Sequence, residues 1–172
     1  KPHIAMSITG IITTLNEAKN IEACIRSLQQ VCDEVVVVDS NSQDNTVELA
    51  QAAGAKVFLH EYIGDGLQKN LCLPYATNSW VLSIDADERL SDELVEFIRQ
   101  TDFDKTPYDG FALRRRNYIG ERWVKCCRWY PDYLVRLFRK DKLRFAELKQ
   151  HAFVPEHNTL RIKADLIHYR YK

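Results

Sequence analysis

Two aspartates, Asp85 and Asp87, are the residues of this chain whose types and spacing most clearly predict chemistry. A single alanine separates them, and they follow an apolar run at residues 80–84 that predicts a buried strand. Carboxylates in such a place are costly unless a cation compensates their charge. Mg²⁺ prefers one or two carboxylates plus phosphate oxygens, and ligands of open α/β sheets bind at strand ends. The pair therefore predicts a metal–nucleotide site.

Two further residues of the first half could contact a nucleotide. Asp39 ends an apolar run at residues 34–38, where a carboxylate can accept hydrogen bonds from a base or a ribose. The alternative is that Asp39 and Ser42 only cap the following helix, although Asp39 lies early for a cap, which favours a functional role. Lys69 could neutralise a diphosphate, and an ordinary solvated lysine is its alternative.

The turn after the first expected strand contains Thr13, Leu15 and Glu17. Such a turn offers backbone N–H groups and the positive end of a helix to a nucleotide. It carries no glycine-rich phosphate-binding pattern. Nearly every α/β protein has a turn of this kind, so the turn alone discriminates little.

Three consecutive arginines stand at residues 114–116. On a strand, Arg114 and Arg116 share one face and Arg115 takes the other. The pair would suit a phosphate on an acceptor, and a solvated edge strand is the alternative. Nucleic acid is not an expected partner, because 24 Lys+Arg balance 24 Asp+Glu and the formal net charge is zero.

Asp132 is a candidate general base. Aromatic residues surround it in the sequence, namely Trp123, Trp129, Tyr130 and Tyr133. Aromatic faces stack on sugar rings, although such clusters more often belong to a core. The late histidines, His151, His157 and His168, are each more often structural than catalytic when considered alone.

The first half alternates strand and helix signals. Strands are expected at residues 8–14, 34–38, 55–59 and 80–84, and helices after Asn16, after Ser42 with Asp44, over 68–76 and from Ser91. This alternation predicts an α/β fold with a mostly parallel sheet and helices on both faces. After about residue 107, longer and more exposed strands are expected at residues 110–118, 133–139 and 160–171.

The chain of 172 residues, 45% apolar and 28% charged, fits one globular domain. We divide it into a nucleotide-binding half, residues 1–106, and a more variable second half, residues 107–172. The five cysteines lack metal-ligand spacing and are expected to be buried free thiols of a reducing cytosol. No signal peptide or membrane span is expected, and Met6 is expected to be the natural first residue.

In this order the residues resemble the inverting family 2 glycosyltransferases of the GT-A fold. The matching segments of the first half are residues 13–17, 37–46, 68–70 and 83–89. The second half is similar to one branch, the lipopolysaccharide core β-1,4-glucosyltransferases. That similarity rests on residues 115–118, 129–133, 136–139 and 166–169.

The resemblance implies a UDP-sugar donor, with UDP-glucose favoured, and a saccharide or lipid-linked saccharide acceptor such as lipopolysaccharide core. It implies that Thr13, Leu15, Glu17 and Asp39 hold the base and ribose, and that Lys69 lies near the diphosphate or the base. Asp85 would contact the ribose or the metal, and the site of Mg²⁺ or Mn²⁺ would be formed by Asp87, Asp85 and His151. Arg116 and Arg136 would contact substrate. The implied location is the cytoplasm, with peripheral contact at the inner membrane as an option.

One position departs from the branch. Where its members usually carry His-Glu, this chain has His151-Ala152. The base is therefore sought among Asp132, Glu147 and Glu156, with Asp132 preferred. Family members commonly continue with helical segments, so the chain is expected to be a catalytic core.

Two other functions stay open. A nucleotidyltransferase would need a glycine-rich phosphate loop after the first strand, and residues 13–17 offer none. A catalytically weak module that only binds nucleotide sugars has Ala152 as its support.

Overall fold

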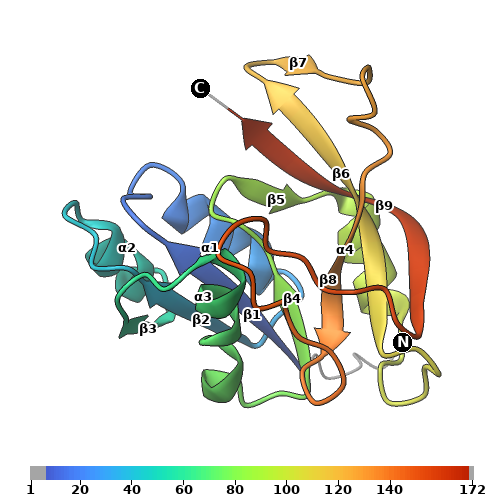
Figure 1. Ribbon diagram of the computed structural model, residues 1–172, viewed down its shortest axis with the longest axis horizontal. Coiled ribbons are helices and arrows are strands. Elements are labelled where there is room, and N and C mark those ends of the chain that lie inside the picture. The colour runs from blue at the N-terminus through green and yellow to red at the C-terminus, as the bar shows by residue number, and fades with distance from the viewer. Residues whose placement is uncertain (1–6, 171–172) are drawn as a thin grey trace.

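The computed structural model describes residues 7–170. The expectation about Met6 and the last residue of the strand expected at 160–171 lie outside the described residues. Helices and strands alternate in the first half and strands dominate the second, as Figure 1 shows. No helix within residues 7–170 is long and apolar enough to cross a membrane.

One nine-stranded sheet organises the fold, in the order β3-β2-β1-β4-β8-β6-β9-β5, with β7 paired to β6. In the first half, β1 (Ile8–Thr14), β2 (Glu34–Asp39), β3 (Lys56–Leu59) and β4 (Trp80–Ser83) pair with one another in parallel, and the short β5 (Glu88–Leu90) pairs antiparallel with a strand of the second half. The strands of the second half are β6 (Gly110–Ile119), β7 (Arg122–Trp123), β8 (Tyr133–Arg139) and β9 (Thr159–Arg170). Strand β8 runs antiparallel to β4 and β6, whereas β9 runs parallel to β6. The predicted parallel half and mixed half are confirmed.

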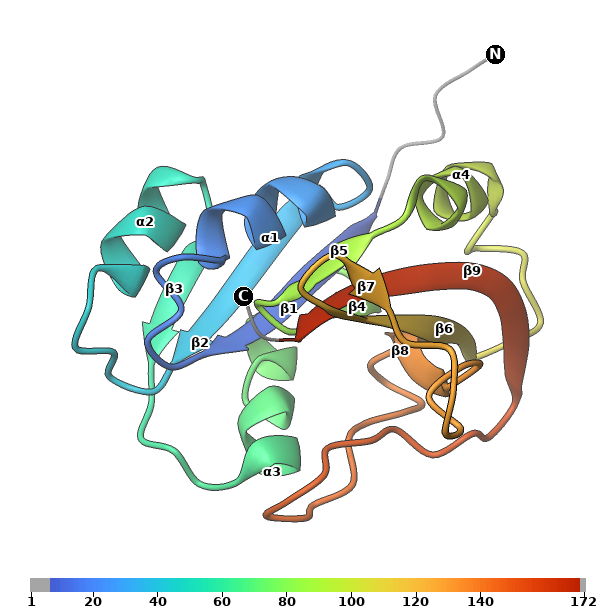
Figure 2. The same cartoon turned by 90° about the horizontal axis from the view of Figure 1, so that it is seen from above.

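Helices cover both faces of the sheet (Figure 2). Helices α1 (Ile21–Gln29), α2 (Thr46–Ala52) and α4 (Asp92–Gln100) lie on one side, and α3 (Asp65–Asn70) lies on the other. Each side has its own apolar core. Leu28 and Ile25 of α1 are fully buried against one face, while Phe138 and Phe145 meet edge to face on the other.

Several expectations about helix ends need correction. Asn16 does not cap α1, which begins at Ile21; instead its side-chain oxygen accepts a hydrogen bond from the backbone N–H of Gln43. The weak helix expected over 68–76 is two pieces, α3 and a 3₁₀ turn over Leu73–Tyr75. Ser91 does cap α4, because its Oγ accepts a hydrogen bond from the N–H of Leu94.

The second-half strands are less exposed than their sequences suggest. Residues 110–113 of β6 and 135–138 of β8 are buried, because these strands lie inside the sheet between β4 and β9.

The five cysteine thiols differ in exposure. Cys24, Cys32 and Cys72 are buried, and burial raises the pKa of Cys72 to about 12, whereas Cys126 and Cys127 are exposed, contrary to expectation.

Candidate active site

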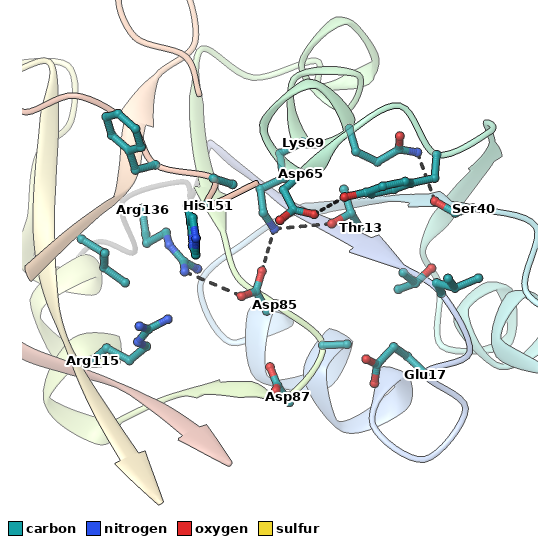
Figure 3. A pocket seen from close by; sticks show the side chains of 18 of the residues that line it. Thr13, Glu17, Ser40, Asp65, Lys69, Asp85, Asp87, Arg115, Arg136 and His151 are labelled. Carbon is teal, nitrogen blue, oxygen red and sulfur yellow. Dashed lines mark hydrogen bonds and ion pairs between the residues drawn. The ribbon is translucent and has the colours of Figure 1, made fainter. Parts of the chain in front are cut away.

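A cleft of about 650 Å³ opens at the carboxyl ends of β1 and β4, and Figure 3 shows its side chains. Both halves of the chain line it. The predicted residues found there are Thr13, Leu15, Glu17, Lys69, Asp85, Asp87, Asp132, Arg136, His151 and Ala152. The parallel strands thus bring the first-half candidates together where the sequence predicts a nucleotide.

Asp85 is held between two cations. Lys69 Nζ lies 2.6 Å from Asp85 Oδ1 and 3.4 Å from Thr13 Oγ1, and Arg136 Nη2 lies 3.7 Å from Asp85 Oδ2. Desolvation acts to raise the pKa of Asp85, but the charges of Lys69 and Arg136 outweigh it and hold that pKa below its ordinary value. Asp85 is therefore ionised at neutral pH, and Lys69 is fixed at the cleft.

A buried ion pair supports this arrangement from beneath. Arg136 Nη1 donates to Glu88 Oε1 at 2.7 Å, and the same oxygen accepts a hydrogen bond from the backbone N–H of Asp85 at 2.6 Å. The side chains of Glu88 and Arg136 are 0% and 6% exposed. Burial raises the pKa of Glu88, against the attraction of Arg136. Glu88 thereby connects Arg136 of β8 to the backbone of the loop that carries Asp85.

Glu88→Ala is expected to lower the free energy of unfolding by about 3–5 kcal/mol, because it removes the closest counter-charge of the buried Arg136 and leaves only Asp85, at 3.7 Å. Urea denaturation followed by circular dichroism measures this change. Glu22→Ala is the matched control. It removes an exposed pair with Arg26 and should cost less than about 0.5 kcal/mol. Similar costs for the two variants would contradict the supporting role of Glu88.

Asp87 faces a histidine that the sequence did not assign to it. Asp87 Oδ2 lies 3.0 Å from His168 Nε2, and His168 Nδ1 lies 2.8 Å from Asn117 Oδ1. The amide nitrogen of Asn117 donates to the carbonyl of Trp129, so its oxygen is left to accept the Nδ1 proton. The other ring nitrogen, His168 Nε2, therefore faces Asp87. This nitrogen carries either a lone pair or a second N–H.

A divalent cation fits this chemistry. A carboxylate and an imidazole nitrogen suit Mn²⁺ or a similar ion, and ligating histidines usually donate their other N–H to an oxygen. Among residues 7–170, no three His, Cys, Asp or Glu side chains are placed to hold a metal together. The predicted set of Asp85, Asp87 and His151 is thus not assembled. His151 lines the cleft from an exposed loop, and His168 contacts Asp87 instead.

The register of β5 and β9 explains how His168 reaches Asp87. These strands are antiparallel, with Glu88 opposite His168, and the N–H of Tyr169 donates to the carbonyl of Asp87. Because β5 has only three residues, it has no periodicity that the sequence could reveal. The only earlier signal for His168 is its place in the segment 166–169 that resembles the family.

The turn residues line the cleft as expected. Leu15 is 53% exposed there. Burial raises the pKa of Glu17, and the negative charges of Asp87 and Asp85 add to that effect, against a hydrogen bond from Asn20. Glu17 is thus a carboxyl group whose proton affinity is increased by its place beside the two aspartates.

Asp39 does not reach the cleft. Its side chain is fully buried, and its carboxylate accepts hydrogen bonds from the hydroxyls of Thr14 and Ser42 and from the N–H of Ser42. All these bonds are 2.6–2.8 Å long. Asp39 therefore has a local structural role in this structure, and its expected contact with a nucleotide stays a prediction. Ser40, the next residue, lines the cleft instead.

The three consecutive arginines share faces as expected, but their partners differ from those expected. Arg114 and Arg116 do share a face, but both pair with Asp165, at 2.7 and 2.9 Å. Asp165 is 1% exposed. Arg116 is neutralised there and is not among the residues that line the cleft, and its expected contact with substrate stays a prediction. Arg115, on the opposite face, lines the cleft.

Asp132 stands in the cleft and pairs with Arg115, whose Nη2 lies 3.0 Å from Asp132 Oδ2. The other base candidates lie outside the cleft. Glu147 is exposed, and Glu156 is exposed and pairs with Arg161. Of the three candidates, Asp132 is the one that lines the cleft.

The loop over residues 146–153 closes the cleft on the side of α3. Gly66 and Asp65 donate backbone hydrogen bonds to the carbonyls of Leu148 and Lys149, at 3.3 and 3.1 Å. A Cβ on Gly66 would lie 2.0 Å from the carbonyl oxygen of Ala146, so only glycine allows this approach. The contact carries His151 and Ala152 to the cleft.

Several known proteins are similar to this chain in sequence. The chain is 44% identical over 95 residues to an uncharacterized glycosyltransferase of Rickettsia bellii, covering 55% of this chain and 32% of that protein. It is 31% identical to the lipopolysaccharide core biosynthesis glycosyltransferase LpsC of Rhizobium meliloti, covering 96% of this chain and 64% of LpsC. The chain thus spans about a third of the Rickettsia relative's length.

Among solved structures, S. aureus TarS 1–349 in complex with UDP-GlcNAc superposes with a TM-score of 0.68. The two are 19% identical, and the match covers 97% of this chain and 59% of TarS 1–349. At this identity the likeness shows the fold alone, which is of the GT-A type. The family model for glycosyl transferase family 2 matches residues 9–169, and the chain therefore belongs to that family.

Proposed function

We propose that this chain is the catalytic core of a metal-dependent inverting glycosyltransferase. Its donor would be a UDP-sugar, with UDP-glucose preferred, and its acceptor a saccharide such as lipopolysaccharide core. The observation that carries the proposal is the cleft in which Lys69 holds Asp85 while Asp87 faces His168. The likeness to LpsC supports the acceptor class, and the UDP-GlcNAc complex of TarS supports the donor class.

The donor diphosphate would lie against Lys69 and the two aspartates, with its nucleoside along Thr13, Leu15 and Glu17. Asp87 and His168 would hold the divalent cation, Mg²⁺ or Mn²⁺, and Asp85 would add its partly neutralised carboxylate. When bound, the cation would stabilise the departing nucleoside diphosphate as a Lewis acid. Lys69 and Arg136 add positive charge on the same side of the cleft.

Asp132 would act as the general base. Its carboxylate would take the proton of the acceptor hydroxyl as that oxygen attacks the anomeric carbon, while the bond from this carbon to the diphosphate breaks on the opposite face. Arg115 would orient the carboxylate through their 3.0 Å ion pair. The products are then a glycoside of inverted configuration and a nucleoside diphosphate.

A donor panel tests this proposal. Thermal unfolding is measured with UDP-, GDP- and ADP-sugars in the presence of Mn²⁺, because a ligand stabilises the native state in proportion to its occupancy. UDP-glucose is expected to raise the melting temperature most, and no nucleotide selectivity would contradict the donor assignment.

Ala152 supports one alternative, a module that binds the donor without transferring it, because a methyl group stands where the branch usually has Glu. UDP binding without hydrolysis of UDP-glucose or transfer to any of a wide acceptor panel would favour that alternative.

We further propose a cytoplasmic location with peripheral contact to the inner membrane, since the proposed acceptor class includes lipid-linked saccharides. We propose no role for nucleic acid.

A further inference from the structure

Strand β6, the short β7 and the end of β9 project together beyond the rest of the molecule (Figure 1). We call residues 119–130, which turn from β6 through β7 toward β8, the hairpin tip. The hairpin tip carries three exposed cations, Arg122, Lys125 and Arg128, and a single carboxylate, Glu121. In a chain of zero formal net charge, this is a local concentration of positive charge.

These cations differ from the arginines of β6. Arg114 and Arg116 are neutralised by the buried Asp165. Within the described part of the chain, Arg122, Lys125 and Arg128 form no ion pair, so their charge is directed to solvent. Their positive charges are therefore available to a negatively charged binding partner.

The hairpin tip also gathers aromatic and apolar side chains. Of the three tryptophans, Trp80 is 3% exposed in the core, whereas Trp123 and Trp129 are partly exposed in the hairpin tip. Lys125 Nζ lies 4.0 Å above the ring of Trp123. Ile119 and the neighbouring Tyr169 are 46% and 38% exposed.

We propose that the hairpin tip docks on an anionic lipid bilayer. Tryptophan and tyrosine favour the membrane–water interface, where an apolar ring and a polar edge are both satisfied. Basic residues beside them are attracted to anionic headgroups over about a Debye length. The exposed cations, which form no ion pair within the described residues, suit the anionic headgroups of such an interface, and the two indoles and Ile119 suit its apolar layer. This partner is favoured over a soluble polyanion, which would use the cations but not Ile119.

The position of the hairpin tip relates docking to the cleft. Strand β6 carries Arg115 at the cleft and continues directly into the hairpin tip. A docked tip would therefore hold the acceptor side of the cleft near the lipid surface. This deepens the peripheral contact proposed above and does not depend on which reaction the cleft performs.

The test is binding to vesicles of phosphatidylcholine alone or with phosphatidylglycerol, followed by co-sedimentation. We expect binding only to the anionic vesicles. The variant Arg122→Glu/Lys125→Glu/Arg128→Glu should bind at least about tenfold more weakly. Its matched control, Lys142→Glu/Arg144→Glu/Lys163→Glu, changes the net charge equally at exposed residues elsewhere and should bind like the wild type.

Brominated lipid gives a second readout, because it quenches tryptophans that reach the bilayer. Quenching of Trp123 and Trp129 is expected, whereas the buried Trp80 should be unaffected. Equal losses in the two charge variants, no binding to anionic vesicles, or binding without quenching would overturn the proposal. Binding to a soluble polyanion such as heparin as tightly as to vesicles would do the same. UDP binding is also measured on both charge variants. Unchanged UDP binding shows that a variant is folded, and it tests the proposed donor site independently of vesicle binding.

Discussion

Asp87→Ala is expected to weaken Mn²⁺-dependent binding of UDP by more than about 100-fold, or about 2.7 kcal/mol. The reason is that Asp87, with His168, offers the carboxylate–imidazole pair of the cleft, while Asp85 is already compensated by Lys69 and Arg136. Isothermal titration calorimetry with UDP and Mn²⁺ measures the loss. Without metal, wild type and variant should bind UDP with similar, low affinity.

Asp92→Ala is the matched control for this change. Asp92 is exposed in the first turn of α4, five residues along the chain, and lies outside the cleft. It should bind UDP like the wild type. An intermediate result is expected for His168→Ala, since this variant keeps the carboxylate of Asp87, the ligand type that Mg²⁺ and Mn²⁺ both accept. Full metal-dependent binding in Asp87→Ala would show that the cation is held elsewhere.

Asp132→Asn is expected to lower the rate of sugar transfer by about 10²–10⁴-fold, the usual contribution of a general base. The amide is nearly isosteric and can still accept a hydrogen bond from Arg115, so UDP–Mn²⁺ affinity should be unchanged. The rate is measured as the release of UDP when the glucose of UDP-glucose is transferred to an acceptor, or slowly to water. A lower rate at unchanged affinity assigns the loss to chemistry rather than binding.

Glu147→Gln and Glu156→Gln are the controls for the base. Both residues are exposed and lie outside the cleft, so their variants should retain transfer. If Glu156→Gln lost the activity while Asp132→Asn kept it, the base would be misassigned. Loss in none of the three would instead favour a mechanism without a side-chain base.

The sequence predicted the parallel half of the fold well because its signals are local. Runs such as residues 35–38 are buried on both faces of the sheet, as continuous apolar patterns indicate. The position of the Asp85–Asp87 pair at a strand end followed directly. The hydrogen bond of Asp39 was not predictable in this way, because nothing in its own segment shows that Thr14, on the neighbouring strand, uses its carboxylate.

The second half was harder to predict because its site contacts depend on strand pairing. His168 meets Asp87 across 81 residues through the three-residue β5. Arg116 is neutralised by Asp165 on β9, which neighbours β6 in the sheet although the two residues are 49 apart in the chain. Neither partner can be chosen from periodicity. The strand alternation did place Arg115 opposite Arg114 and Arg116, yet only the structure shows which face meets the cleft.

The most direct test of the central claim is a calorimetric titration of UDP into the wild-type chain with Mn²⁺ and again with a chelator. The arrangement of Lys69, Asp85, Asp87 and His168 predicts saturable binding with Mn²⁺ that weakens by more than about 100-fold when the metal is removed. Equal affinity under both conditions, or no binding in either, would contradict a metal-dependent UDP-sugar site in this cleft.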